Sequence, residues 1–472
     1  MSEMITGFLS PISDFLYYPV LIILLLGIGL YFTFRTKFVQ LSNFKEAVHV
    51  VMEAPEEEGS VSSFQALMIS TASRVGTGNI VGVATAICLG GYGAVFWMWI
   101  VALIGGASAF IESTLAQIYK RRDTFSGESY GGPSYYIESA LHSRTLGIIF
   151  SIFLILTYAV GFNMLAAFNL RDSFQVYDFY DPQWTPILVG AGLALVTAYC
   201  VLGGGKRIIQ FTSFLVPFMG MIYVAVAVLM IILNLNYMPT VFKLVFQDAF
   251  NFKAIFSGIA GSSMMYGIKR GLFSNEAGIG SAPNAAAAAH VSHPVKQGLV
   301  QMMSVFIDTL VICSATAFMC LSSGVTPSPE LSGAPYAQAA LSTFLGGYGN
   351  LFITISLMLF GFTTLIGNLY YVDNNLAYIF GKMPRASFMI AFRLVAAGVI
   401  FLGAIQQADL VWLMADVMMA LMALINLPSI LILGKTALAA LSDYSKQRKA
   451  GQKPVFYAKN IGLDDSQLDY WK

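Results

Sequence analysis

The sequence predicts an all-α membrane protein with about eleven transmembrane helices, and its composition, its apolar segments and its basic residues all indicate this class. The chain has 472 residues, of which 57% are hydrophobic and only 11% are charged. A soluble domain carries about 25% charged residues, and a single soluble core stops growing at roughly 250–300 residues. A lipid bilayer is therefore the solvent that this composition fits. The formal net charge of +1 gives no electrostatic reason to expect nucleic-acid binding.

Eleven segments are long and apolar enough to cross the hydrocarbon layer, which takes about 20 residues of helix. Inside a bilayer all backbone polar groups must be bonded internally, and the side chains lack the alternation of a β-barrel, so we expect helices. The seventh segment is interrupted by polar residues. The predicted spans are residues 15–34, 65–87, 93–118, 146–170, 185–203, 208–234, 254–290, 297–322, 350–380, 387–404 and 409–438.

Basic residues distinguish the two sides of the membrane, because cytoplasmic loops are enriched in Lys and Arg. One set of alternate loops is rich in them, whereas the opposite set holds only Arg171, Lys243 and Lys253. We therefore expect a multi-pass protein of the plasma (inner) membrane, with the N-terminus outside and the C-terminus in the cytoplasm. The basic set contains Arg35, Lys37, Lys45, Lys120, Arg121, Arg122, Arg144, Lys206, Arg207, Lys296, Lys382, Arg385, Lys446, Arg448, Lys449, Lys453 and Lys459.

Two predicted spans carry glycines and polar residues at mid-membrane depth. The second span is interrupted at residues 73–79 and the seventh at residues 270–276. Glycine permits unwinding, which frees N–H and C=O groups to bind something other than the next helical turn. The two breaks lie five spans apart, in the first span of each of two five-span sets that run in opposite directions. Broken helices at corresponding positions of two halves are the best sequence indication of a secondary-transporter binding site.

The breaks fit a zwitterion and a cation. Half-helix N-termini attract a carboxylate, and freed carbonyl groups attract an ammonium group or Na⁺. Two structural alternatives remain open. Gly78 and Gly82 could serve close helix packing. The charged residues of the breaks could form a structural ion-pair network, an alternative favoured for the two cations because they would repel a substrate ammonium group. That network would join Lys269, Arg270 and Glu276 to Arg74, Glu112 or Asp308.

At these residues the sequence resembles the alanine or glycine:cation symporter family, of the amino acid–polyamine–organocation superfamily. TASRVGTGNIVGVATAICLGG and GIKRGLFSNEAGIGSAPNAAAAA resemble its first-half and second-half signatures. VFIDTLVICSATAF and FGFTTLIGNLYY resemble later blocks, and the likeness runs from about residue 15 to about residue 440. The resemblance implies a leucine-transporter-like fold, with a core of two inverted five-helix repeats, two discontinuous helices and one extra N-terminal helix.

The predicted division of the chain follows from these repeats. Residues 1–64 would hold the extra N-terminal transmembrane helix and an inner segment, of which residues 40–54 form an amphipathic helix. Residues 65–235 and 236–440 would be the two five-helix repeats. Residues 441–472 would be a cytoplasmic tail, either disordered or docked on the inner face. Residues 331–345, which are too short and polar to span, are expected to form a helix that caps the outer vestibule.

The resemblance implies site roles residue by residue. The backbone N–H groups of Thr77 and Gly78 would bind the substrate carboxylate, with the Asn79 side chain nearby. The carbonyl group of Gly271 or a neighbour would bind the ammonium group, with Phe273 as a wall of the site.

A sodium ion would sit between the first and eighth core helices, and its ligands would all be oxygen atoms. Sodium is a hard cation and prefers such ligands, by the reasoning that applies to calcium and magnesium. Thr364 would also border the substrate. The expected ligands are the carbonyl groups of Ala72, Val75 and Phe360 and the hydroxyl groups of Thr363 and Thr364.

Two positions depart from the family. Ala166 stands where relatives commonly carry Gln, and Asn368 stands where they commonly carry Trp. If these positions line the side-chain pocket, the pocket is larger and differently polar. Glutamine or asparagine then becomes a candidate main substrate in place of alanine or glycine.

The leading hypothesis is Na⁺-coupled uptake of a small neutral amino acid by alternating access. The rival is H⁺ coupling on the same fold, with Glu276 as the candidate titratable group. ATP-driven pumping is not expected, because the Gly203–Lys206 stretch is followed by Arg207 and not by the Ser or Thr of a phosphate loop. No nucleophile–base set indicates an enzyme, and the sequence does not predict an oligomeric state.

Overall fold

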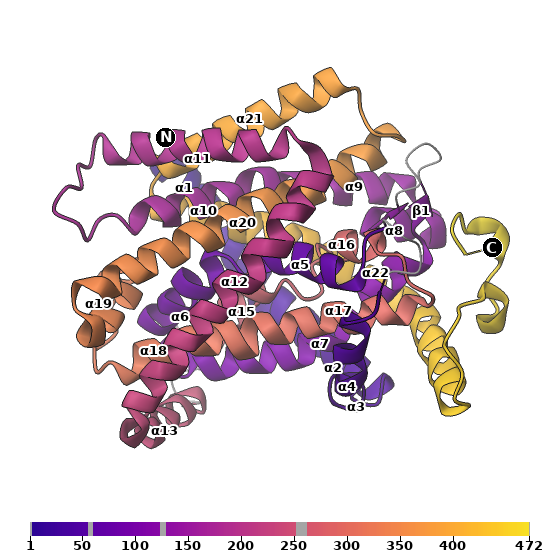
Figure 1. The fold of residues 1–472 in the computed structure, drawn as a ribbon, viewed down its shortest axis with the longest axis horizontal. Coiled ribbons are helices and arrows are strands. Elements are labelled where there is room, and N and C mark those ends of the chain that lie inside the picture. The colour runs from indigo at the N-terminus through magenta and orange to yellow at the C-terminus, as the bar shows by residue number, and fades with distance from the viewer. Residues whose placement is uncertain (1, 55–59, 123–128, 252–261, 472) are drawn as a thin grey trace.

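The structure is a computed structural model, and it describes all residues except 1, 55–59, 123–128, 252–261 and 472. The described chain is a bundle of helices, most of which run along its longest axis (Figure 1). Strands β1 (Arg121–Arg122) and β2 (Ser129–Tyr130) pair antiparallel at one end of the bundle. An all-helical bundle agrees with the predicted fold class.

The first half of the chain contains these helices, in order: α1 (Ser2–Phe15), η1 (Leu16–Leu21), α2 (Ile22–Arg35), α3 (Val39–Ser42), α4 (Phe44–Val51), α5 (Ser63–Arg74), η2 (Gly78–Gly82), α6 (Val83–Gly90), α7 (Ala94–Ile118), α8 (Pro133–Leu141), α9 (Arg144–Ile155), η3 (Leu156–Gly161), α10 (Phe162–Asp172), α11 (Thr185–Val201), α12 (Gly204–Leu233) and η4 (Leu235–Tyr237).

The second half contains α13 (Met238–Ala249), α15 (Ser263–Asn275), α16 (Pro283–Ala288), α17 (Pro294–Val305), η6 (Phe306–Cys313), α18 (Ser314–Ser322), η7 (Pro329–Leu331), α19 (Ala334–Leu345), α20 (Gly347–Phe380), α21 (Ala386–Ala404), α22 (Ala408–Lys449), η8 (Ala458–Ile461) and η9 (Asp465–Gln467). The segments η1, η2, η3 and η6 are π-helical, and they connect α-helical stretches of the same spans.

Long apolar helices dominate the described part of the chain. Eight of its helical stretches are long and apolar enough to cross a membrane, and a ninth is counted if α5 and η2–α6 form one bent span. Helix α11 is apolar but shorter, and the predicted seventh span begins within residues 252–261, outside the described residues. The chain is therefore an integral membrane protein, whereas the count of eleven spans is not confirmed and stays a prediction.

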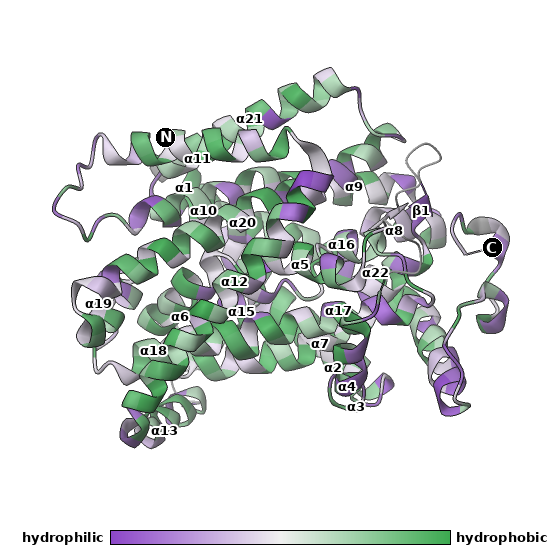
Figure 2. Cartoon of the chain, viewed as in Figure 1, coloured by the Kyte–Doolittle hydropathy of each residue, from purple (hydrophilic) through white to green (hydrophobic). Residues whose placement is uncertain are grey.

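Most residues of the long helices are hydrophobic, and hydrophilic residues gather in several loops and helix ends, among them the C-terminal end of the chain (Figure 2). Leu195 on α11 and Phe214 and Ile232 on α12 each expose more than 60% of their surface. A large exposed apolar surface marks an interaction site in water, but in lipid it lies in its natural solvent. These residues are expected to face acyl chains.

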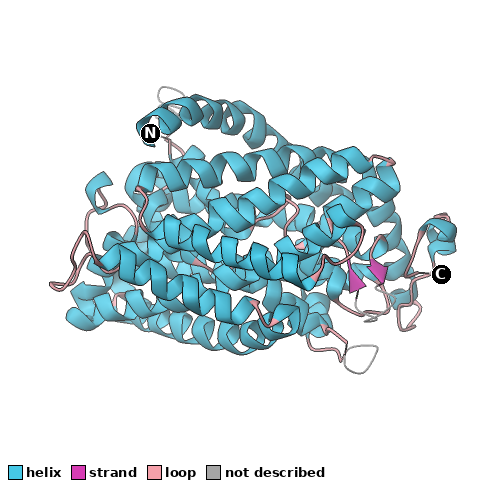
Figure 3. Ribbon diagram, turned by 90° about the horizontal axis from the view of Figure 1, so that it is seen from above, coloured by secondary structure: helices cyan, strands magenta, loops and turns pink. Residues whose placement is uncertain are grey.

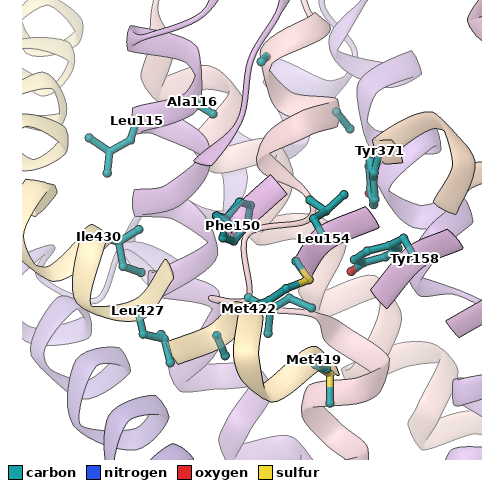
Figure 4. Close-up of a cluster of buried hydrophobic side chains, with 14 of the residues drawn as sticks. Leu115, Ala116, Phe150, Leu154, Tyr158, Tyr371, Met419, Met422, Leu427 and Ile430 are labelled. Carbon is teal, nitrogen blue, oxygen red and sulfur yellow. The ribbon is translucent and has the colours of Figure 1, made fainter. Parts of the chain in front are cut away.

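The interior is a continuous apolar core at the crossing of α7, α9, η3, α20 and α22 (Figure 4). Leu115, Phe150, Leu154 and Met422 are buried there. Tyr158 and Tyr371 close the core on the side of the functional site, with ring centroids 5.3 Å apart at 80°. This packing fixes the helices around the two breaks.

Two smaller predictions are confirmed as helices. Residues 331–345 contain α19, whose N-terminal loop borders a large vestibule. The amphipathic segment contains α3 and α4, but the acidic loop at residues 56–58 lies outside the described residues. The C-terminal tail is docked at the end of the bundle that carries β1 and β2, as both views show (Figures 1 and 3).

Candidate functional site

The first predicted break is confirmed as a bend between α5 and η2. Helix α5 begins with a capping box between Ser62 and Gln65 and ends at Arg74, and the two half-helices differ in direction by 53°. The Asn79 side chain holds the bend: its Oδ1 accepts the Gly76 N–H at 2.9 Å, and its Nδ2 donates to Oδ1 of Asp308 at 2.7 Å. One side chain thus replaces the helical partner that the bend removes.

The second break lies later than predicted, so the position 270–276 is wrong. Helix α15 is continuous through Asn275 and ends where Glu276 adopts φ 53°; the chain then runs without helix to Pro283. Gly271 lies within this helix and packs closely on α7, where an added Cβ would lie 3.2 Å from the Cα of Met98. Close packing, and not unwinding, therefore accounts for a glycine at this position.

A narrow cavity separates the two breaks. It has room for about one water-sized sphere, about 10 Å³. An amino acid is larger than this space, so the walls of the cavity must move before an amino acid can enter. The cavity is lined by Ser73, Arg74, Gly76, Thr77, Gly78, Phe162, Ala166, Phe273, Glu276 and Thr364.

Five of the eight predicted substrate-binding residues line this cavity, and three do not. Asn79 and Asn368 do not line the cavity, but each forms a hydrogen bond with a residue that does. Asn368 accepts a hydrogen bond from the Ser73 hydroxyl at 2.7 Å and donates to Oδ1 of Asn163 at 2.8 Å. Gly271, on α15, packs against α7 and does not line the cavity. The lining residues among the eight are Thr77, Gly78, Ala166, Phe273 and Thr364.

At two positions of the first break, the backbone lies so close to a neighbouring side chain that only glycine fits. A Cβ on Gly78 would lie 2.9 Å from Cε1 of Phe273, and a Cβ on Gly76 would collide with the Thr364 hydroxyl. Real Cβ contacts are essentially never that short. The backbone can therefore approach both neighbours only because these residues lack side chains.

Phe162 lines the cavity but was missing from the predicted site. It precedes Ala166 by four residues on α10, and residues four apart share a face of a helix. Its ring lies 5.0 Å from the ring of Phe273. Helical periodicity applied to Ala166 would have identified it.

The predicted sodium ligands form two neighbouring groups of oxygen atoms. The Thr364 hydroxyl lies 3.3 Å from the Ala72 carbonyl oxygen and 3.4 Å from that of Ser73. The Thr363 hydroxyl instead donates to the Phe360 carbonyl of its own helix at 2.9 Å. Val75 sits in the bend next to the first group. Ala72, Ser73 and Thr364 together offer the hydroxyl and carbonyl oxygen atoms that a hard cation prefers.

Arg74 is a buried cation beside the cavity and only 2% exposed. Its Nη1 donates to the Gln301 carbonyl at 3.3 Å, while its Nε and Nη2 make no hydrogen bond in the described structure. It interacts electrostatically with three buried carboxyl groups, those of Glu112, Glu276 and Asp308. Burial of so many charges without direct pairing is expensive, which is typical of functional positions in membranes.

Glu276 brings a carboxyl group to the cavity wall. Its Oε2 accepts the Ser281 hydroxyl at 2.7 Å, and its Oε1 lies 3.5 Å from the Ser73 hydroxyl. These two hydroxyl groups come from the segments around the second and the first break.

The expected partners of Lys269 and Arg270 were wrong. Both cations pair with Asp416 on α22: Lys269 at 2.8 Å and Arg270 through two bonds of 3.1 Å. The Arg270 guanidinium also lies 4.0 Å from the ring centroid of Trp412. The structural role favoured for these cations therefore holds, but Asp416 lies 146 residues away from Arg270 and no local spacing could reveal it.

These ion pairs border a vestibule of about 730 Å³ that leads toward the narrow cavity. Helix α1 contributes Ser13 and Asp14 to its wall, and the η7–α19 region contributes Glu330 and Gly333. The rings of Phe273, which lines the cavity, and Trp412, which lines the vestibule, are in contact, with centroids 5.2 Å apart.

Comparisons with known proteins agree with this geometry. The sodium:alanine symporter family is matched over residues 2–458, and the chain belongs to this family of membrane transporters. It is 42% identical to the "Probable sodium/glutamine symporter GlnT" of Bacillus subtilis (strain 168), over 100% of this chain and 97% of that protein. It is 43% identical to the amino-acid carrier protein AlsT of the same organism, over 99% and 98%. Na⁺ is the coupling ion that this family implies.

The fold also matches a solved transporter structure. The crystal structure of MhsT in complex with L-phenylalanine superposes with a TM-score of 0.61, covering 88% of this chain and 97% of that one. The sequence identity is 14%, so the match concerns the fold alone. It supports the leucine-transporter-like architecture that the resemblance implied.

Proposed function

We propose that the chain couples Na⁺ influx to uptake of a small neutral amino acid by alternating access. The observation that carries the proposal is the cavity between two helix breaks, lined by Gly76, Thr77 and Gly78 of the first break and by Phe273 and Glu276 of the second. Family membership supports the transport class and the cation. A pair of facing half-helix ends offers opposite partial charges, which a zwitterion satisfies.

The substrate carboxylate would bind at the start of η2, through the N–H groups of Thr77 and Gly78. The ammonium group would bind at the end of α15, where helix termination leaves carbonyl groups without helical partners. The carbonyl groups of Phe273 and Ser274 take the role first given to Gly271. Na⁺ would bind at Ala72, Val75, Phe360, Thr363 and Thr364, with Ser73 as a further carbonyl ligand.

The core would consist of two inverted repeats, residues 65–235 and 236–440, after the extra N-terminal helix and before the tail. The N-terminus would lie outside and the C-terminus in the cytoplasm, as the basic loops predict. The vestibule then opens outward and the docked tail faces the cytoplasm. The plasma (inner) membrane is the proposed location.

The side-chain specificity follows from the cavity wall. Ala166 places a small side chain in the cavity lining beside Phe162, and Asn368 accepts a hydrogen bond from Ser73 behind the lining. Once the walls move, a small residue at position 166 would favour a longer substrate side chain, such as that of glutamine or asparagine, over alanine or glycine. The name of the GlnT relative points the same way.

The deciding experiment is uptake in proteoliposomes with and without a sodium gradient, run over all common amino acids. We expect uptake that requires Na⁺ and is competed most strongly by glutamine or asparagine. Alanine and glycine as the sole strong competitors would contradict the specificity proposal. Uptake of none of the amino acids under any cation gradient would contradict the transport proposal itself.

H⁺ coupling is the second candidate, because the Glu276 carboxyl group lines the cavity and can carry a proton. Under this mechanism uptake persists without sodium and collapses when the pH gradient is dissipated. A Glu276→Gln variant would then lose coupling to the pH gradient, whereas under Na⁺ coupling it would retain sodium dependence.

A further inference from the structure

The chain after α22 folds back onto the bundle and is held there by specific contacts. Residues 453–471 are called the tail below. The Gln447 side chain binds both backbone groups of Val455, at 2.9 Å and 2.8 Å. Phe456, Leu468 and Trp471 are at most 9% exposed. Because side chains near both of its ends are buried, the tail is packed against the bundle and is not a free, solvent-exposed segment.

The end of the tail binds the end of α7. The Trp471 indole N–H donates to the Gln117 carbonyl at 2.7 Å, which satisfies a buried donor. The Lys120 ammonium group lies 3.7 Å from the centroid of the Tyr470 ring, in a cation–π contact. The Phe456 and Trp471 rings lie 5.2 Å apart, so the two ends of the tail form one unit.

The tail also binds the linker between α16 and α17. The Phe456 N–H donates to the Ser292 carbonyl at 2.9 Å, and the Tyr470 hydroxyl lies 3.3 Å from Nδ1 of His290. Lys120, which the tail covers, donates to the Ala289 carbonyl at 2.8 Å. The linker, residues 289–293, is therefore fastened both to α7 and to the tail.

This linker joins the two broken helices at their tail-side ends. It follows α16 directly, and the His290 N–H donates to the Val61 carbonyl, two residues before α5, at 3.0 Å. Helices α5 and α16 are the tail-side halves of the first and second broken helices. A motion that opens the cavity toward the tail must displace these halves and hence the linker.

We propose that the tail is an inhibitory latch, which holds α5 and α16 closed through residues 289–293 and must release before the cavity opens toward the cytoplasm. The proposal rests on the alternating-access function proposed above. The latch consists of hydrogen bonds and ring contacts, which are individually weak in proteins, so it can release and reform reversibly. The tail therefore sets how often the inward-facing state forms without touching the substrate.

The test measures tail-side opening directly, by thiol labelling of Ser70→Cys in a chain whose four native cysteines are replaced by alanine. Ser70 is fully buried on α5, and its hydroxyl donates to the Leu67 carbonyl of its own helix at 2.9 Å. A membrane-impermeant maleimide applied from the tail side reaches this position only when α5 moves. Trp471→Ala in this background should raise the labelling rate about fivefold to tenfold.

The matched control is Tyr457→Ala, because Tyr457 is an aromatic residue of the same tail with 59% of its surface exposed. It should leave the labelling rate unchanged. Trp471→Phe keeps the ring contact with Phe456 but removes the N–H donor, so it should give an intermediate rate. Deletion of residues 453–472 should give the largest increase.

Equal labelling rates for Trp471→Ala, the deletion and Tyr457→Ala would overturn the latch. A merely structural role for the tail would appear as a lower unfolding temperature with no selective labelling at residue 70. The labelling readout needs no substrate, so it judges the latch even if uptake fails for every amino acid. That uptake result would overturn the transport proposal alone.

Discussion

The two ends of the molecule close the central cavity by different means. At the vestibule end, a 730 Å³ space reaches down to Trp412. The Trp412 ring contacts the ring of Phe273, and Asn169 donates a 3.0 Å hydrogen bond to the Thr77 hydroxyl. These two contacts join the wall of the vestibule to the lining of the cavity.

The tail end is sealed by successive polar layers. Asn368 joins Asn163 at 2.8 Å next to the cavity, and Asn375 joins Asn284 at 2.9 Å further along. Lys120 then ties α7 to the linker after α16, and the tail covers it. Buried hydrogen-bond networks strengthen one another in a low-dielectric interior and are costly to disrupt in part.

Under the alternating access proposed above, this difference would make opening at the tail end the slower conformational step. Packed interfaces switch between discrete arrangements, so the hydrogen-bonded layers would exchange together. The four predictions below test this assignment and the parts that it rests on.

The largest effect on substrate binding is expected in the central cavity, which lies between the two ends. Gly78→Leu places a side chain where even a Cβ lies 2.9 Å from Phe273, so it should fill the cavity and abolish substrate binding. Gly192→Leu is the control, because nothing lies within 4 Å of a Cβ there. Binding is measured by equilibrium dialysis with labelled substrate. Unchanged affinity in Gly78→Leu would place the carboxylate site elsewhere.

The next effect concerns the vestibule wall. Asp416→Ala leaves Lys269 and Arg270 without their carboxylate, and breaking a buried pair costs about 3–5 kcal/mol. Asp409→Ala, at an exposed position on the same helix, should change stability by less than about 0.5 kcal/mol. Thermal unfolding in detergent compares them. Equal unfolding temperatures would mean that the vestibule wall is not held by these ion pairs.

A smaller effect is expected in the polar layers. Asn375→Ala removes the acceptor of the Ser151 hydroxyl and the donor to Asn284, and each unsatisfied buried group costs about 1–3 kcal/mol. The variant should also label faster at Ser70→Cys from the tail side. Asn460→Ala, at an exposed position in the tail, is the matched change without such a partner. Identical labelling in both would remove the layers from the barrier.

The smallest effect is a pH dependence at the linker. Burial lowers the pKa of His293 to about 4, while Asp443 at 3.3 Å opposes the shift and Lys296 adds to it. The unfolded chain, with a pKa near 6.5, therefore binds more protons between these values. Stability is fully present above about pH 6.5 and decreases as the pH falls toward 4.

Between pH 7 and 5.5 this loss amounts to about 1 kcal/mol. His293→Gln should lose that part of the pH dependence, as measured by the unfolding temperature at the two pH values. An unchanged slope in the variant would assign the dependence to other groups.

The sequence predicted those parts of the fold and site that depend on local pattern. Apolar segments gave the long helices, and the glycines near residue 76 gave the first bend, because unwinding there has a local cause. Five of the eight predicted substrate residues line the cavity. Residues that adjoin a helix break in the sequence also lie near it in the structure, so a local pattern can identify them.

The remainder depended on tertiary contacts. Gly271 could signal either unwinding or close packing, and only the neighbouring Met98 decides for packing. Asp416 pairs across a long sequence separation with Arg270, and the aromatic end of the tail could be placed only by Gln117 and Lys120. No periodicity within one segment contains such information.

The Asn79 side chain, which holds Gly76 and Asp308 at once, has a thermodynamic consequence. Because this side chain fixes the bend when the protein folds, the backbone there loses its conformational entropy during folding. That loss then does not reduce the free energy of ligand binding. Preorganisation of this kind leaves more of the contact energy available for affinity. If the backbone of the bend binds the substrate as proposed, selectivity among amino acids would reside in the side chains of the cavity wall.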